Sequence, residues 1–224
     1  MTGSTQSDGG AFRSRVLSLF PTGVIVGYVP DADKLNSELR SAIVRKREEH
    51  AGNQQSSTVG WESPKGMQGW ASGAALDLAR HAVAFCDRFT VDQKQVDKPR
   101  FRWNLEMWAN VYPPMGSKQS HAHPGTLWAC VYYVDDGSTG SGADHGGELV
   151  LYDPRFPMNQ MYAPGVGFRW PDGMREHSNY GIRPTSGMIV AFSGWLLHGV
   201  RAYSGKRERI SIAMNLMVAP VPDG

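Results

Sequence analysis

The sequence is poor in cysteine. Only Cys86 and Cys130 occur among its 224 residues, and both lie within apolar runs. Two isolated cysteines exclude a disulfide framework of the kind that holds small secreted domains together, and free cysteine is among the most frequently buried residue types. We therefore expect two buried thiols in a reducing compartment, and a cytoplasmic protein.

Long apolar segments and an excess of one charge are also lacking. The apolar run over residues 16–29 is broken by Pro21 and Gly23 and is too short to span a bilayer, and the first ten residues contain no apolar core of a signal peptide. The net charge is +2 and the basic residues are dispersed, whereas nucleic-acid and membrane-surface binders concentrate theirs. We expect no membrane contact and no nucleic-acid partner.

What the sequence does contain suits one large domain. Its 41% hydrophobic residues can bury a substantial core, and its 26 glycines and 14 prolines indicate many turns between short strands. We expect a disordered tail over residues 1–11. A single domain should then cover 12–224, with a helical part at 12–99 and a β-rich core at 100–220.

Apolar spacing predicts the elements of the helical part. Two strand segments flank a Pro/Gly break within residues 16–29, and a helix runs from a cap at Asp31 or Asp33 to about residue 50, with Leu35, Leu39 and Ile43 on one stripe. Residues 51–71 indicate a long loop, and a second helix covers about 73–89. We expect the two helices to pack together against a sheet.

After residue 99 the apolar period changes to two. Odd-numbered residues from 103 to 111 are all apolar and alternate with mostly polar ones, which is typical of a strand. Further strands are predicted at 127–134, 147–152, 187–192 and 209–218. Two irregular inserts lie at 135–145 and 156–183, and the second is a candidate lid. Helices followed by antiparallel strands favour an α+β chain whose catalytic part is an all-β barrel or sandwich.

Three of the seven histidines form a candidate metal site. His121 and His123 stand two apart on a segment predicted to be extended, so their side chains project to the same face, and His198 ends a strand-like run at 189–197. Neutral imidazole suits iron, zinc, copper and nickel, and three protein nitrogens leave positions open for substrate or dioxygen. The spacing predicts a metal centre at His121, His123 and His198, with iron(II) as its metal.

An arginine and a serine follow the third histidine at the start of the next strand. Arg209 and Ser211 are two apart and therefore point to the same side of that strand. A guanidinium fork with a neighbouring hydroxyl binds a carboxylate. A metal and a carboxylate clamp together describe a site for a 2-oxo acid, held by chelation at one end and by an ion pair at the other.

The stretch from about residue 103 to 217 resembles the iron(II)- and 2-oxoglutarate-dependent oxygenases, and more narrowly a bacterial branch of that superfamily. The matching motifs are His121-Ala122-His123-Pro124, the strand 129–134, Gly147-Glu148-Leu149-Val150 with Asp153-Pro154-Arg155, Pro184 with Gly187, Phe192 before His198, and Arg209-Ile210-Ser211 running into Asn215. The segments Leu19-Phe20-Pro21-Thr22 and Gly60-Trp61 resemble the same branch. The resemblance therefore covers nearly the whole chain.

The resemblance implies a double-stranded β-helix (jelly-roll) core with the N-terminal helices packed on its major sheet. It implies iron(II) as the metal, 2-oxoglutarate and O2 as cosubstrates, and hydroxylation of a small molecule, an amino acid derivative or a peptide. By the same resemblance His121 and His198 would be iron ligands. Arg209, assisted by Ser211, would bind the distal carboxylate of 2-oxoglutarate.

One position departs from the superfamily, which usually has Asp or Glu where His123 stands. His123 replaces the carboxylate in a three-histidine site, or it lies nearby while a carboxylate such as Glu148 or Asp153 ligates, or the site binds metal poorly. A neutral histidine in place of a carboxylate raises the net charge of the centre by one unit. We favour the three-histidine interpretation.

Several further residues have two interpretations each. Asn110 is either a contact of the 2-oxo acid or a strand-end residue, Trp128 is either a wall of the substrate pocket or a core residue, and Arg155 is either a substrate anchor or part of a structural ion pair. Tyr132 and Tyr133 face opposite sides of their strand, so at most one of them lines the barrel interior.

Two other functions stay open on the sequence alone. A three-histidine iron site also suits thiol and diketone dioxygenases that need no 2-oxoglutarate, and Arg209 with Ser211 is the feature against that function. The barrel is also compatible with a non-enzymatic, cupin-like binding protein. The sequence specifies neither the substrate nor the oligomeric state, although a homodimer is compatible with it.

Overall fold

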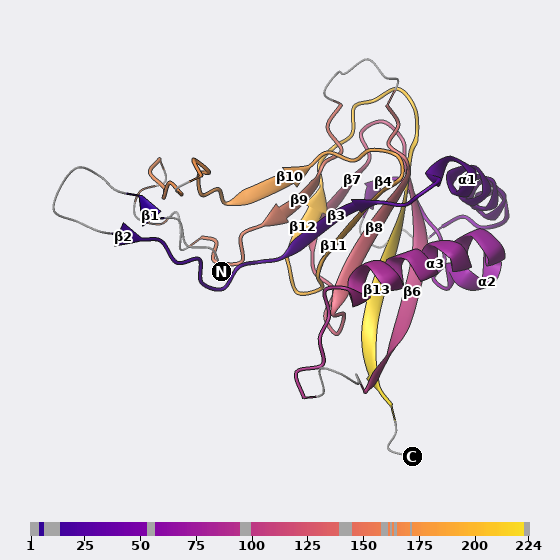
Figure 1. Ribbon diagram of the computed structural model, residues 1–224. Helices are drawn as coiled ribbons and strands as arrows, with labels where there is room; N and C mark the ends of the chain where they lie inside the picture. Colours follow the sequence, from indigo (N-terminus) through magenta and orange to yellow (C-terminus); the bar gives the residue numbers. More distant parts are fainter. Residues whose placement is uncertain are drawn as a thin grey trace.

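Two antiparallel sheets that face each other form the centre of the molecule (Figure 1). The computed structural model describes residues 5–6, 14–52, 57–94, 100–138, 145–157, 161, 163, 165–170 and 172–221. The major sheet has six strands in the order β3-β11-β8-β13-β6-β5, and the minor sheet has five in the order β10-β9-β12-β7-β4. This is the double-stranded β-helix predicted above, in an α+β chain.

The major sheet consists of β3 (Val24–Tyr28), β5 (Trp61–Glu62), β6 (Phe101–Tyr112), β8 (Trp128–Asp135), β11 (Met188–Ser193) and β13 (Arg209–Pro220). The minor sheet consists of β4 (Ser57–Val59), β7 (Ser117–His121), β9 (Leu149–Tyr152), β10 (Asn179–Ile182) and β12 (His198–Val200). A separate two-stranded pair is made by β1 (Thr5–Gln6) and β2 (Ser14–Arg15).

Helices α1 (Ala32–Glu49), α2 (Met67–Trp70) and α3 (Ser72–Asp87) lie along the outer face of the major sheet (Figure 1). The alternation of each long strand explains this packing, since successive side chains point to opposite faces. The even-numbered residues of β13 from Ile210 to Leu216 are buried and join Leu39 and Ile43 of α1 and Leu78 of α3 in one apolar cluster. The prediction of helices packed on the major sheet is confirmed.

The odd-numbered residues of β13 point the other way, into the space between the sheets. They are Arg209, Ser211, Ala213 and Asn215, and three of the four are polar. A second apolar cluster, which includes Tyr133, Leu149, Leu151 and Phe192, fills the adjoining part of the interior. The barrel therefore holds a cavity that has the polar row of β13 on one side and apolar side chains, such as Leu149 and Phe192, on another.

Several predicted elements differ from the structure. Residues 51–71 contain β4, β5 and α2 rather than a plain loop, and the insert 156–183 contains β10. Residues 16–19, predicted as a strand, have no regular structure, while Val24–Tyr28 is the second predicted segment, confirmed as β3. Asp31 is the N-cap residue of α1 but makes no side-chain capping bond. The predicted tail, residues 1–11, lies outside the described residues except for Thr5–Gln6, so the division into tail and domain stays a prediction.

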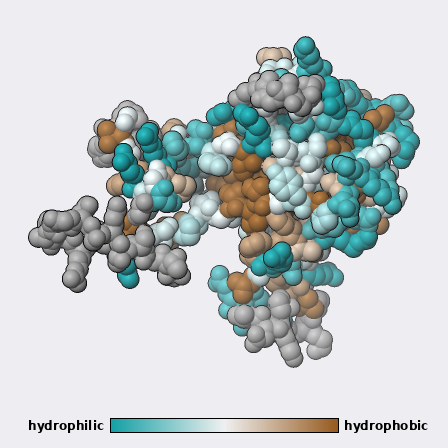
Figure 2. All heavy atoms as spheres, turned by 45° about the horizontal axis from the view of Figure 1, so that its top comes forward, coloured by the Kyte–Doolittle hydropathy of each residue, from teal (hydrophilic) through white to brown (hydrophobic). Residues whose placement is uncertain are grey.

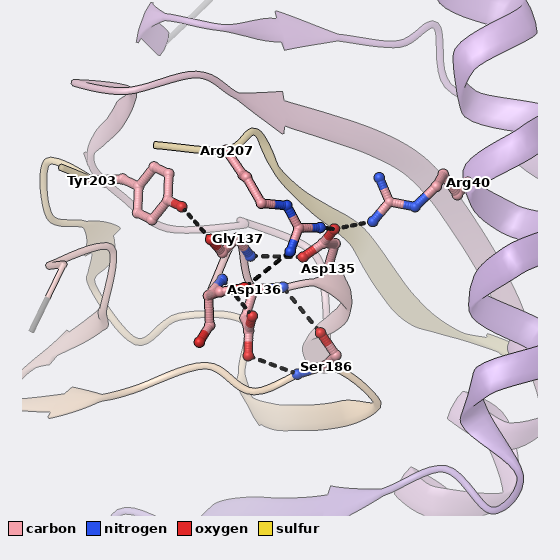
Figure 3. Close-up of polar contacts among 8 residues, drawn as sticks. Arg40, Asp135, Asp136, Gly137, Ser186, Tyr203 and Arg207 are labelled. Atoms are coloured by element: carbon pink, nitrogen blue, oxygen red, sulfur yellow. Dashed lines mark hydrogen bonds and ion pairs between the residues drawn. The ribbon is translucent and has the colours of Figure 1, made fainter. Parts of the chain in front are cut away.

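A buried aspartate joins the helical layer to the end of the barrel (Figure 3). Asp135, the last residue of β8, forms ion pairs with Arg40 of α1 and with Arg207, whose Nη2 lies 2.6 Å from Oδ2. Its Oδ1 accepts the backbone N–H of Gly137, and the Gly137 carbonyl accepts the hydroxyl of Tyr203 at 2.9 Å. These contacts fix the connection between β12 and β13, which delivers Arg209 to the cavity.

Exposed apolar side chains occur on one face of the molecule (Figure 2). The sheet-edge strand β3 contributes Val24, Val26 and Tyr28, which are 36%, 48% and 63% exposed. Among the described helices, none is both long enough and apolar enough for a bilayer span.

Candidate metal centre

The structure brings the three predicted histidines to one point. His121 ends β7, His123 follows two residues later, and His198 begins β12, where it pairs directly with His121. Their ring centroids are 4.4 to 5.1 Å apart, and one ring nitrogen from each lies within 4.8 Å of the others. A single ion can be reached by all three. His198 does not end a strand as predicted, because β11 stops at Ser193 and a turn precedes β12.

Backbone carbonyls orient two of the three rings. His121 Nδ1 lies 2.8 Å from the carbonyl of Gln119, and His198 Nδ1 lies 2.8 Å from the carbonyl of Leu196. A carbonyl accepts only from a protonated nitrogen, so each ring carries its hydrogen on Nδ1 and leaves Nε2 as the free donor of electrons. This is the arrangement that metal-binding histidines use.

Burial keeps the three imidazoles neutral. It lowers the pKa of His198 to about 3 and that of His123 to about 4, and it also lowers the pKa of His121. The positive charge of Lys118 adds to the lowering in each case. Because only neutral imidazole binds a metal, the site is ready for a cation over a wide pH range.

The two alternative carboxylate ligands lie elsewhere. Asp153 accepts from Arg155 at Oδ2 (2.6 Å) and Oδ1 (3.0 Å), and this pairing lowers the pKa of Asp153. Glu148 directly precedes Leu149, which belongs to the interior cluster, so it faces the opposite side of the minor sheet. Within the described ranges, the histidines are the only group of ligand side chains close enough for a metal.

Arg209 faces the same cavity as the histidines, together with Ser211 and Asn110. Its side chain is 1% exposed, yet among the described residues its Nε and Nη1 have no hydrogen-bond partner. The centre of the Tyr133 ring lies 5.2 Å from the Cζ of Arg209, and the Tyr133 hydroxyl is buried without a well-formed hydrogen bond among the described residues. Burial raises the pKa of Tyr133, and the neighbouring Arg209 opposes this effect. A buried guanidinium with unpaired N–H groups destabilises the fold unless a ligand accepts hydrogen bonds from them. A carboxylate is a ligand that can do so.

Residues 106–215 match the model of a family described as "Putative 2OG-Fe(II) oxygenase". This match confirms the predicted resemblance of the chain to the iron(II)- and 2-oxoglutarate-dependent oxygenases. The protein is a 2-oxoglutarate-dependent oxygenase that uses iron(II), 2-oxoglutarate and O2, and its three-histidine cluster and unpartnered arginine fit those groups. No curated protein sequence matches the oxygenase.

Solved structures share the fold of this oxygenase at low sequence identity. A Pseudomonas putida prolyl-4-hydroxylase is 17% identical with a TM-score of 0.57, over 90% of this chain and 94% of that one. A Trichoplax adhaerens prolyl hydroxylase, in complex with a hypoxia inducible factor peptide fragment, is 13% identical with a TM-score of 0.61, over 88% and 84%. HygX from Streptomyces hygroscopicus, with nickel and 2-oxoglutarate bound, is 15% identical with a TM-score of 0.58, over 88% and 83%.

Two predicted substrate contacts lie away from the cavity of the oxygenase. Trp128 is on the helix side of the major sheet, where its indole N–H donates to Thr90 Oγ1 at 2.9 Å. Arg155 is paired with Asp153 and, at 2.7 Å, with Glu176. Of the two interpretations given for each residue, these contacts support packing for Trp128, which shares a face with the helix-side core, and a structural ion pair for Arg155.

Sequence reasoning missed other residues that line the cavity. Lys118 reaches it from β7 and pairs with Glu62 of β5, Nζ to Oε2 at 2.5 Å, with both side chains 11% exposed. Trp108 lines it from β6, with its ring 6.0 Å from that of His123. The alternation of β6 placed Trp108 on the polar face of the strand, which was the available signal. Glu62 gave none, since β5 has only two residues.

Proposed function

We propose that this oxygenase is a hydroxylase in which His121, His123 and His198 hold the iron and Arg209 holds the distal carboxylate of 2-oxoglutarate, with Ser211 and Asn110 beside it. The observation that carries the proposal is a buried guanidinium with two unpartnered nitrogen atoms in the same cavity as the three histidines. The 2-oxo acid would then be held at both ends, by the metal and by the arginine.

The residues have distinct tasks in this proposal. When bound, iron(II) with 2-oxoglutarate would activate O2, and O2 would supply the oxidising power that breaks a C–H bond. The neutral histidines leave the full charge of the metal in the cavity, and Arg209 adds a second positive site for a dianionic cosubstrate. Tyr133 donates a hydroxyl next to Arg209, and the apolar cluster around Phe192 excludes water from the adjoining interior.

The substrate class we propose is a small molecule, an amino acid derivative or a peptide. The solved structures that share the fold include prolyl hydroxylases, one of them with a peptide bound. The exposed side chains of β3 support a homodimer, and the free thiols of Cys86 and Cys130 support a cytoplasmic location. Sedimentation of the purified protein tests the dimer, and a monomer at all concentrations would contradict it.

The test of the hydroxylase is succinate formation from 2-oxoglutarate when anaerobic enzyme with iron(II) is transferred to air. Arg209→Ala should weaken 2-oxoglutarate binding and spare metal binding, because the arginine is separate from the histidines. His198→Ala should abolish metal binding. Succinate formation that persists in both variants would contradict the assigned roles.

One observation favours a second candidate. The ligand cluster contains three histidines and no carboxylate, a set that also suits dioxygenases that need no 2-oxo acid. Oxygen consumption with a thiol or a diketone in the absence of 2-oxoglutarate would favour this function over the hydroxylase.

A further inference from the structure

Two neutral polar groups lie unpartnered in the cavity beside the histidines. They are the indole N–H of Trp108 and the side-chain carbonyl oxygen of Asn215. The two residues are only 6% and 8% exposed, and in the part of the chain that the structure describes neither atom has a hydrogen-bond partner. The great majority of buried polar groups in native proteins have a hydrogen-bond partner. These two unpartnered groups therefore indicate a place where a ligand binds.

The register of the major sheet puts both groups at the level of the metal centre. Trp108 of β6 pairs with Ala213 of β13, so Asn215 is its diagonal neighbour on the inner face, at about 7–8 Å between Cα atoms. The Trp108 ring is 6.0 Å from the ring of His123. Arg209 lies on the same face of β13 but four residues before Ala213, which is about 13 Å along the strand. Trp108 and Asn215 therefore flank the histidines on the side away from Arg209.

Asn215 is tied to the third histidine through the neighbouring strands. It pairs with Ala129 of β8, which pairs in turn with Phe192 of β11. The Phe192 ring is 4.6 Å from the ring of His198. The residue between Asn215 and Phe192 in this row is an alanine, and Ala213 separates Asn215 from Arg209 and Ser211. Small side chains thus leave room in front of the carboxamide.

The polar groups of this side suit a ligand that both donates and accepts a hydrogen bond. The two lysines nearest to it are already paired: Lys118 with Glu62, and Lys65, whose Nζ lies 5.5 Å from the centre of the Trp108 ring, with Glu106 at 2.7 Å. Trp108 can only donate, and the unpartnered Oδ1 of Asn215 accepts. An uncharged group with one hydrogen-bond acceptor and one donor would pair with both unpartnered atoms, and an amide is such a group.

We propose that Trp108 and Asn215 bind an uncharged amide of the substrate. The Trp108 N–H donates to the amide carbonyl, and the amide N–H donates to Asn215 Oδ1. This inference rests on the proposed function, because it makes the two residues the substrate contacts of the hydroxylase. It names the substrate class as an amide, such as a peptide bond or an amidated amino acid.

The competing occupant is the cosubstrate. The inner carboxylate of 2-oxoglutarate accepts hydrogen bonds only, so it would use Trp108 but would be repelled by Asn215 Oδ1 unless that side chain turned its NH2 group inward. The two occupants differ in what the variants change. Substitution of Trp108 or Asn215 would weaken binding of the amide if our proposal is correct. It would weaken binding of 2-oxoglutarate if the cosubstrate occupies the site.

The experiment measures binding by NMR, without turnover. The full-length protein is loaded with zinc, which suits three imidazole ligands, and saturated with 2-oxoglutarate. Two probes are titrated: N-acetyl-L-alanine N′-methylamide, and methyl O-acetyl-L-lactate, in which ester oxygens replace both amide N–H groups. We expect the amide to bind about tenfold or more tightly than the ester, because a buried acceptor left unpaired penalises the ester.

The variants are Trp108→Phe and Asn215→Leu, each of which removes one polar group and keeps the volume nearly constant. Asn215→Leu should reduce the preference for the amide by about fivefold or more. Trp108→Phe should weaken the binding of the amide and of the ester alike, by about fivefold or more, because the carbonyls of both probes can accept from the Trp108 N–H. The 2-oxoglutarate dissociation constant should be unchanged in both variants. Trp103→Phe is the matched control, because Trp103 lies on the same strand but on the helix side, where its N–H donates to Asp87 at 3.1 Å. It should leave the preference intact. Because the two variants are independent, misfolding of one leaves the other as the test.

Three results would overturn the inference: equal binding of amide and ester, no binding of the amide to the loaded protein, or a weakened 2-oxoglutarate complex in the two variants. Failure of the proposed function has a different signature, because then the wild-type zinc protein would not bind 2-oxoglutarate at all. Intact 2-oxoglutarate binding without amide preference would refute only the amide site.

Discussion

The substitution Arg209→Met should change stability and cosubstrate affinity in opposite directions. Methionine keeps much of the length of arginine and can pack against Tyr133, but it removes the charge and all donors. Arg209 is 1% exposed, and within the described structure its Nε and Nη1 are unpartnered. A buried unsatisfied donor costs about 1–3 kcal/mol, and replacing buried charge by a well-packed apolar residue is often neutral or stabilising. The metal-free variant should therefore be more stable by about 1–3 kcal/mol.

Binding of 2-oxoglutarate should respond in the opposite way. Each hydrogen bond to a charged group contributes about 1.5–3 kcal/mol, so two of them contribute about 3–6 kcal/mol. This corresponds to a loss of affinity of roughly two to four orders of magnitude. Ser211 and Tyr133 would retain a small part of the interaction.

Urea unfolding of the metal-free protein measures the first effect, and calorimetric titration of the zinc protein with 2-oxoglutarate measures the second. In a chain of this size the expected stabilisation raises the melting temperature by about 2–4 °C per kcal/mol. Arg47→Met is the control, because Arg47 forms an exposed pair with Glu208 and should change stability by less than about 1 kcal/mol. A marked destabilisation of the metal-free Arg209→Met protein, with unchanged 2-oxoglutarate affinity, would refute the assignment and make Arg209 a structural residue.

Three further perturbations have defined outcomes. Burial lowers the pKa of His198 to about 3, so its contribution to the free energy of unfolding is fully present above the ordinary pKa of 6.5 and is lost as the pH falls below that value. The free energy of unfolding of the metal-free protein should therefore decrease from pH 7 to pH 5, and His198→Phe should make this decrease smaller. Asp135→Asn breaks two ion pairs of a 7% exposed carboxylate and should cost about 1–3 kcal/mol in urea unfolding, with unchanged metal content. Lys118→Met leaves Glu62 buried and unpaired and should destabilise the fold, whereas the double variant with Glu62→Gln should recover most of the loss; additive effects would contradict the pairing.

The faces of the long strands could be predicted from the sequence because alternation is a local property. Tyr132 lies on the helix side and donates its hydroxyl to Asn36 at 2.6 Å, while Tyr133 lies in the cavity, as opposite faces require. The same rule puts Arg209 and Ser211 on one face. The rule also decides between the two interpretations of Trp128: it is four residues before Tyr132 on the same strand and must therefore point to the helices.

Edge strands and pairings between sheets could not be predicted in the same way. The strand β5 has two residues and exists because it pairs with β6, with Glu62 opposite Asn110. Its ion pair with Lys118 joins the two sheets and depends on their packing. Unpartnered groups such as the Trp108 N–H are equally invisible in a sequence, because the absence of a partner is a statement about every neighbour in space.

The position of His123 shows that its side chain reaches the other two histidines for a reason other than the predicted one. The spacing of two residues between His121 and His123 predicted one continuous strand, but β7 ends at His121 and the chain turns. The segment is held instead by the His123 N–H, which donates to the Gly194 carbonyl at 2.8 Å, and by a turn closed from Thr126 to His123. A Cβ on Gly194 would lie 2.3 Å from the Thr126 carbonyl oxygen, so the contact requires glycine. His123 therefore reaches the centre through packing against the turn before β12, which also leads into His198, and one local structure positions two of the three histidines.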